Sequence, residues 1–149
     1  GRPNVGFRVS TLLEDLKVYL GYDHCDEAVL VGVGALGHVL LHYGGFSKYG
    51  LDIVAGFDRE PKEKRVGDKP VLPIAKLVAF LKRTHINIGI IAVPAAEAQG
   101  VADMLVSGGV QAIWNFAPTA INLPDKILVK NENLAASLAA LTEELRRRR

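Results

Sequence analysis

The chain has 149 residues, with 49% hydrophobic and 23% charged residues, which indicates one soluble globular domain with a single buried core. Its net charge is only +2, and four of the positive charges lie in the C-terminal arginine run 146–149. The rest of the chain is therefore slightly acidic, which excludes a broad basic surface for nucleic acid.

The first segment, residues 1–26, is predicted to form a helix that packs on the core. Thr11 and Glu14 have the spacing of a capping box near the start of this helix. Apolar residues recur at helical spacing, at Val9, Leu12, Leu13, Leu16, Tyr19 and Leu20.

A strand–turn–helix pattern follows, and it is the most specific feature of the chain. An apolar strand at 28–33 runs into a G-x-G-x-x-G turn that opens a helix at 35–43. A second apolar strand at 51–57 ends at Asp58, 21 residues after Gly37. These offsets are those of a dinucleotide-binding fingerprint, in which the helix start holds the phosphates and the acid accepts hydrogen bonds from a ribose. The predicted phosphate-binding residues are Gly32, Gly34, Ala35, Leu36 and Gly37.

The remaining elements continue the alternation of strands and helices. Strands are predicted at 71–73, 86–93, 112–115 and 127–130, and helices at 74–81, 95–107 and 134–148. Residues 58–69 are predicted to be a polar loop. Short links between such elements indicate a Rossmann-type α/β fold, with a doubly wound, mostly parallel sheet over 27–130 and helices on both faces.

Ligands of such folds lie across the carboxyl ends of the strands. Asp58 and Arg59 are therefore expected at the adenosine ribose. The nicotinamide half is expected near two further strand ends, at Val93, Pro94 and Ala95 and at Asn115, Phe116, Ala117 and Pro118. A carboxylate at the ribose repels a 2′-phosphate, so we expect NAD(H) rather than NADP(H), although Arg59 could attract that phosphate.

Catalytic and metal chemistry are not expected. The sequence offers no Ser-His-Asp arrangement, carboxylate pair or Cys/His cluster, so we expect a domain that binds its cofactor without consuming it. His38 and His42 have the i, i+4 spacing of a metal pair, but no third ligand is apparent, and we interpret them as structural.

Membrane insertion and disulfide formation are not expected either. Residues 28–46 lack formal charge, but their glycines and histidines fit the strand–turn–helix reading better than a membrane span. The single cysteine, Cys25, excludes an internal disulfide and fits a reducing cytoplasm.

The last helix carries a leucine stripe at Leu134, Leu138, Leu141 and Leu145. The stripe can cover the chain's own sheet or pack on a partner subunit, and its spacing alone favours the first.

Taken together, Gly6-Phe7, the turn at 32–37, the Tyr43-x-Gly-Phe segment, Phe57-Asp58, the 93–95 segment and the 115–118 segment resemble the Rex family of redox-sensing transcriptional repressors. The resemblance covers essentially the whole chain. It implies a homodimer that senses the NADH/NAD+ ratio, with Phe7 beside the cofactor and the C-terminal helix, 131–149, swapped onto the partner.

Two departures from the family pattern limit this inference. Rex proteins carry a winged-helix domain before this region, to which nothing here corresponds, so DNA contact is expected only through such a domain. The family also usually has a Tyr and an Asp where this chain has Phe7 and Asn133. Two alternatives stay open: an NAD(H)-binding accessory domain of a redox enzyme such as an NADH dehydrogenase or hydrogenase, and a CoA-binding module.

Overall fold

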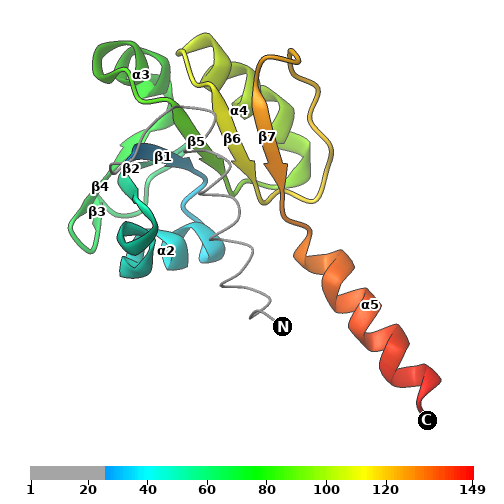
Figure 1. Ribbon diagram of the computed structural model, residues 1–149. Helices are drawn as coiled ribbons and strands as arrows, with labels where there is room; N and C mark the ends of the chain where they lie inside the picture. Colours follow the sequence, from blue (N-terminus) through cyan, green and yellow to red (C-terminus); the bar gives the residue numbers. More distant parts are fainter. Residues whose placement is uncertain (1–25) are drawn as a thin grey trace.

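The computed structural model describes residues 26–149, apart from the side chains of residues 135 and 136. The predicted N-terminal helix and Phe7 lie outside the described residues. The described part is a seven-stranded sheet with helices on both faces, as Figure 1 shows, which confirms the predicted α/β class.

The order of the sheet is β3-β4-β2-β1-β5-β6-β7, and every neighbouring pair except β3–β4 is parallel. The chain builds outward from β1 to β2 and β4, then crosses back to place β5 on the other side of β1. This reversal defines the switch point between β1 and β5, where open α/β sheets bind ligands. The strands are β1 (Asp26–Val31), β2 (Leu51–Asp58), β3 (Arg65–Val66), β4 (Lys69–Pro73), β5 (Ile88–Ile91), β6 (Ala112–Asn115) and β7 (Leu128–Asn131).

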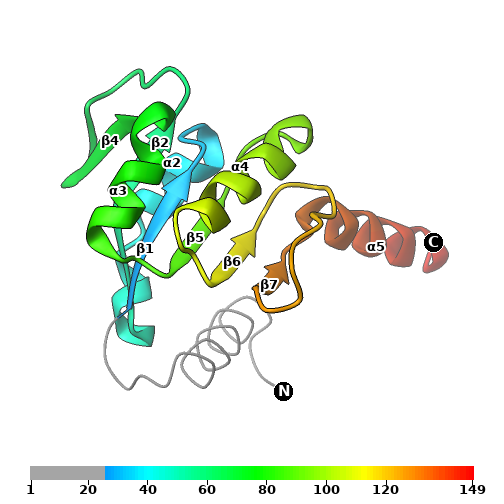
Figure 2. The same ribbon diagram turned by 90° about the horizontal axis from the view of Figure 1, so that it is seen from above.

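Helices cover both faces of this sheet. Figure 1 shows α2 on the opposite side from α3 and α4, and Figure 2 shows the same layers from above. The helices are α2 (Ala35–His42), α3 (Leu77–Thr84), α4 (Ala95–Ser107) and α5 (Leu134–Arg147), with 3-10 helices η1 (Gly44–Tyr49) and η2 (Ile74–Lys76).

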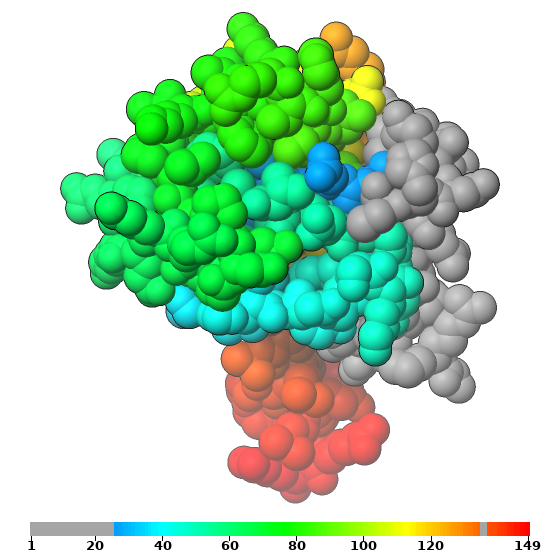
Figure 3. Space-filling view, turned by 90° about the vertical axis from the view of Figure 1, so that its left-hand side faces the viewer, coloured from blue at the N-terminus to red at the C-terminus, as the bar shows by residue number. Residues whose placement is uncertain are grey.

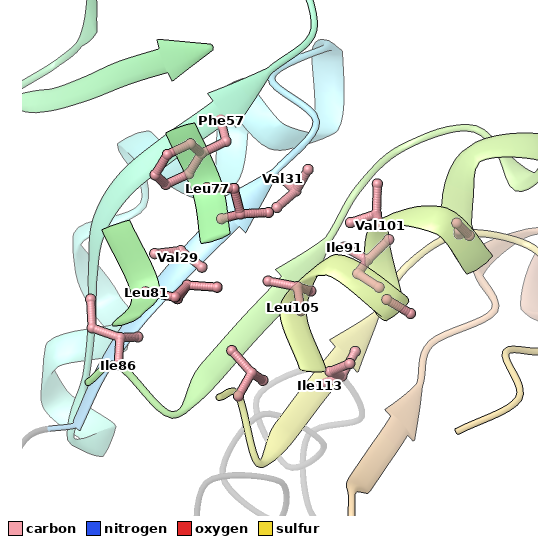
Figure 4. Packing of buried hydrophobic residues seen from close by; sticks show 14 of the residues in the cluster. Val29, Val31, Phe57, Leu77, Leu81, Ile86, Ile91, Val101, Leu105 and Ile113 are labelled. Atoms are coloured by element: carbon pink, nitrogen blue, oxygen red, sulfur yellow. The ribbon is translucent and has the colours of Figure 1, made fainter. Parts of the chain in front are cut away.

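β1 contributes to two hydrophobic cores, because successive side chains of a strand point to opposite faces. Val29 and Val31 pack in the larger core with residues of α3 and α4, which Figure 4 shows. Ala28 and Leu30 belong to a second core with residues of α2 and η1. Burial on both faces explains why the strand is apolar at every position from Ala28 to Val31, after the two more exposed acids at its start.

Trp114, the one tryptophan of the chain, lies in the second core and is 4% exposed. Its ring centroid lies 5.7 Å from that of Phe46 and 4.8 Å from that of Phe116. Within the described part of the chain its Nε1 has no hydrogen-bond partner. Aromatic packing therefore holds the indole.

The polar segment 58–69 differs from its prediction as a loop. It contains β3, which forms an antiparallel hairpin with β4, and Gly67 in the turn has a φ of +62°. Only Val66 of the two β3 residues is buried, so the short strand leaves almost no apolar signal.

β5 is also shorter than the predicted 86–93. Both of its neighbours, β1 and β6, pair with it only over Ile88–Ile91. Ile86 lies outside the strand but is buried in the hydrophobic core, which explains why this position is apolar. At the outer limits of the fold, β1 begins at Asp26 and β7 ends at Asn131, each one residue outside the predicted 27–130.

α5 extends away from the sheet, as Figures 1 and 3 show. Its leucine stripe is between 51% and 67% exposed, at Leu134, Leu138, Leu141 and Leu145. The expectation from spacing that these leucines cover the chain's own sheet is therefore wrong.

Candidate functional site

The packing of β1 on α2 requires glycine at two positions of the turn. Gly32 has a φ of +101°, and a Cβ there would lie 2.6 Å from the carbonyl oxygen of Ala92. A Cβ on Gly37 would collide with the carbonyl oxygen of Gly32. These two glycines therefore let the strand turn sharply into a helix that packs close against it.

Gly34 lies in the same turn, but the fold does not require it to be glycine. A Cβ at this position would have nothing within 4 Å. Gly34 is the N-cap of α2, no side chain caps the helix there, and its first turn holds no acidic residue. The unpaired N–H groups and the positive end of the helix dipole make this a favourable place for an anion.

Asp58 ties the end of β2 to this turn. Its Oδ2 accepts a hydrogen bond from the Val33 N–H at 2.8 Å, and its Oδ1 accepts one from the Glu60 N–H at 3.1 Å. A carboxylate has about four acceptor sites, so both oxygens keep capacity for a further hydroxyl donor. The arrangement suits a ribose beside the phosphate position.

Two hollows open on either side of Gly34 and Asp58, which line both. The smaller hollow, of about 170 Å³, is walled by Ile74, Val93 and Pro94, together with Val31, Gly32, Arg59, Ala92 and Glu97. The larger, of about 260 Å³, lies toward the polar segment and is lined by Val33, Glu60, Pro61, Lys62, Glu63 and Val71. The apolar wall of the smaller hollow, with polar groups at one side, has the character of a site for a flat aromatic ring.

Two of the residues that line the smaller hollow form an ion pair. Arg59 Nη1 lies 3.0 Å from Glu97 Oε1, which joins the loop after β2 to the first turn of α4. Sequence reasoning included Arg59 but missed both Glu97 and Ile74. The available signal was position, because Ile74 directly follows β4 and Glu97 lies in the first turn of α4, the helix that follows β5 at the ligand-binding edge.

The 115–118 segment lies at the end of β6, two strands from β1. Asn115 is fully buried, and its Oδ1 accepts a hydrogen bond from the Ala117 N–H at 3.0 Å. Its Nδ2 donates to the Thr119 carbonyl and to Asn131 Oδ1, each at 3.0 Å. The side chain of Asn115 is thus committed to internal bonds and holds the shape of the segment that follows.

The structure brings only some of the predicted ligand residues together. Gly32, Gly34, Asp58, Arg59, Val93 and Pro94 line the smaller hollow. Ala35 and Leu36 lie in the first turn of α2, and Ala95 begins α4. Phe116 is half-buried against Trp114, Ala117 is buried and Pro118 is exposed, and none of the three lines either hollow.

His38 and His42 have ring centroids 4.9 Å apart, and His38 Nε2 lies 3.3 Å from Glu63 Oε1. Over residues 26–149, no group of three or more His, Cys, Asp or Glu side chains could hold a metal ion. The helices of the same range are all too short or too polar to cross a membrane.

Comparison with known proteins places this geometry in a family. A family model described as a CoA binding domain matches residues 24–119, from the start of the sheet to just beyond β6. The redox-sensing transcriptional repressor Rex of Carboxydothermus hydrogenoformans is 43% identical over 149 residues, which cover 99% of this chain and 72% of that protein. The chain belongs to the Rex family of redox-sensing transcriptional repressors.

Solved Rex structures agree in fold as well as in sequence. The Rex-family repressor RSP, in its complex with β-NAD+ and operator DNA, superposes with a TM-score of 0.81 at 32% identity, covering 93% of this chain and 64% of that one. RSP in complex with β-NADH gives a TM-score of 0.78 at the same identity, covering 93% and 68%. This chain thus spans about two thirds of the length of these Rex proteins.

Proposed function

We propose that this chain is an NAD(H)-binding redox-sensing domain of Rex type, which reads the NADH/NAD+ ratio to control transcription. The observation that carries the proposal is the uncapped start of α2 at Gly34, next to Asp58 and a hollow with an apolar wall. The complexes of RSP with β-NADH and with β-NAD+ and operator DNA support the same ligand pair.

In this proposal each part of the site holds one part of the cofactor. The N–H groups at the start of α2 bind the pyrophosphate, and Asp58 accepts hydrogen bonds from the adenosine ribose. The apolar wall of the smaller hollow takes the adenine ring. The nicotinamide half lies toward the ends of β5 and β6, near Val93 and the 115–118 segment.

The domain is proposed to be a regulator and not an enzyme. When bound, the dinucleotide supplies hydride chemistry, but its use in catalysis needs a group that moves a proton to or from a substrate. The residues proposed to border the nicotinamide are Val93, Pro94, Phe116, Ala117 and Pro118, whose side chains do not titrate. A nicotinamide surrounded by such side chains can be recognised in one redox state without taking part in a catalysed hydride transfer.

We further propose a homodimer in which α5 packs on the partner subunit. The exposure of the leucine stripe supports this, because a helix with an apolar face gains stability only by burying it. Contact with DNA is assigned to a winged-helix domain of Rex type, and the protein is proposed to act in the cytoplasm.

A CoA-binding module is the second candidate, favoured by the family model that matches residues 24–119. CoA carries a phosphate on its adenosine ribose. The Asp58 carboxylate lies where that ribose is expected, and it would repel the phosphate. This charge favours NAD(H) over CoA.

Calorimetric titration of the purified chain with NADH, NAD+, NADPH and CoA tests the proposal. Redox sensing predicts that NADH binds more tightly than NAD+, with NADPH and CoA weaker than both. Equal affinity for NADH and NAD+ would mean that the domain binds the dinucleotide but does not sense the NADH/NAD+ ratio. Binding of CoA alone would refute the proposed cofactor.

A further inference from the structure

The Arg59–Glu97 ion pair lies in the lining of the smaller hollow, where the adenosine half of the cofactor is expected. The residues are 38 positions apart in sequence, so the tertiary fold and not a local helix brings them together. Both line the smaller hollow, as does Asp58. The Glu97 side chain is 31% exposed and the Arg59 side chain 72% exposed, so the acid is the more buried partner of the pair.

Arg59 would be the natural partner of a phosphate on the adenosine ribose. It directly follows Asp58, and a guanidinium binds phosphate oxygens through two parallel N–H groups. In this structure Nη1 is already paired with Glu97 Oε1 at 3.0 Å. Two carboxylates and one guanidinium then surround the expected ribose position, which leaves a net negative charge there.

We propose that Glu97 is a specificity-determining residue, which occupies Arg59 and thereby excludes dinucleotides with a 2′-phosphate on the adenosine ribose. This inference rests on the proposed function, since it concerns the same nucleotide site. Asp58 repels the phosphate directly, while Glu97 removes the cation that would otherwise attract it. Both acids are needed for full discrimination, because Arg59 alone would offset the charge of Asp58.

The variant Glu97→Gln tests this role, because it keeps the size of the side chain and removes its charge. An exposed ion pair of this kind contributes little to stability, so the variant is expected to fold. NADPH should bind up to about fivefold more tightly, because an exposed ion pair withholds Arg59 from the phosphate by no more than that factor. The quantity compared is the ratio of NADPH affinity to NADH affinity in each variant, so that a change common to both cofactors does not count as a gain in NADPH binding.

Two further variants identify the cause of the gain. Arg59→Ala in the Glu97→Gln background should lose the improved NADPH binding, because the freed guanidinium is its source. Asp103→Asn removes the same charge from the same helix, where Asp103 pairs with Gln99 outside both hollows. It should leave NADPH affinity unchanged.

The titrations separate failure of this inference from failure of the proposed function. If the wild type binds NADH but Glu97→Gln gains no NADPH affinity, Glu97 does not determine specificity. The same conclusion follows if Asp103→Asn gives an equal gain, or if the wild type binds NADPH as tightly as NADH. If the folded wild type binds no dinucleotide at all, the proposed function fails and this inference with it.

Discussion

Gly34 is a residue that the fold does not require to be glycine, whereas the proposed ligand does. Gly32 and Gly37 have no room for a Cβ, but Gly34 has open space around it and a φ of −87° that any residue adopts. Packing therefore does not explain glycine at position 34. In the proposed complex, the close approach of a pyrophosphate to the backbone explains it.

The variant Gly34→Ala should consequently fold with an unchanged melting temperature and bind NADH about tenfold or more weakly, since it obstructs a charge-assisted hydrogen bond. Thermal unfolding and calorimetry measure the two effects. Gly100→Ala is the matched control, because a Cβ there, in α4, also meets nothing within 4 Å. It should add about 0.5–1 kcal/mol of stability and leave NADH affinity unchanged. Wild-type NADH affinity in Gly34→Ala would contradict the phosphate position.

Asn115 illustrates the opposite case, a predicted ligand residue whose side chain serves the fold. Asn115→Ala removes the acceptor of the Ala117 N–H and the donor to Thr119 and Asn131. The buried Ala117 N–H left unpaired costs about 1–3 kcal/mol, so the melting temperature should fall by several degrees. Asn122→Ala is the control, because the hydrogen bonds of Asn122 with Gln99 use its backbone and its side chain is exposed. Equal melting temperatures for the two variants would show that the Asn115 bonds do not stabilise the segment.

Among the helices of residues 26–149, α5 is the one whose leucine stripe the chain's own sheet does not cover. Replacing Leu138 and Leu141 together with glutamate should convert a dimer into a monomer, as sedimentation velocity would measure. The melting temperature of the Rossmann core should change little if the core of the monomer is complete without α5. Ala139 and Ala140 lie away from the leucine stripe at 100° per residue, so the same double change there should leave the dimer intact. A wild-type chain that is monomeric at every concentration would contradict the swapped helix.

The elements also show which features a sequence can predict. β1 and β2 were predictable because burial on both faces leaves a nearly continuous apolar run, although β1 begins at Asp26 and ends at Val31, two residues before the predicted 28–33 at each end. The bounds of α4 were predicted to the residue because Pro94 and Gly108 flank it. β3 was not predictable, since only Val66 of its two residues is buried. In the same way, the fingerprint identified Asp58, but the pairing of Glu97 with Arg59 depends on contacts that no local pattern encodes.

At the scale of the whole molecule, the proposed function requires that the redox state of the cofactor affects the rest of the protein. Asn133 stands directly before α5, where its carbonyl oxygen accepts the Ser137 N–H at 3.1 Å. Asparagine and aspartate are about equally favoured at a helix N-cap, so the departure from the Rex pattern keeps a favourable residue type before α5 and removes a charge.

Restoring the pair, as Phe7→Tyr with Asn133→Asp, tests whether that charge matters. We expect the preference for NADH over NAD+ to rise about fivefold or more, the usual lower range of coupling between two sites. Titration of the double variant and of each single variant with both cofactors measures the change. An unaltered ratio in the double variant would mean that the pair does not govern redox discrimination in this protein.

The buried indole of Trp114 gives the molecule a built-in optical reporter. Because the chain has one tryptophan, all of its indole emission comes from a single dry position in contact with Phe116. Reduced nicotinamide absorbs in the near ultraviolet where a buried indole emits, whereas oxidised nicotinamide does not. Energy transfer from Trp114 should therefore quench its fluorescence on addition of NADH and not of NAD+, so the unlabelled protein can report which redox form it holds.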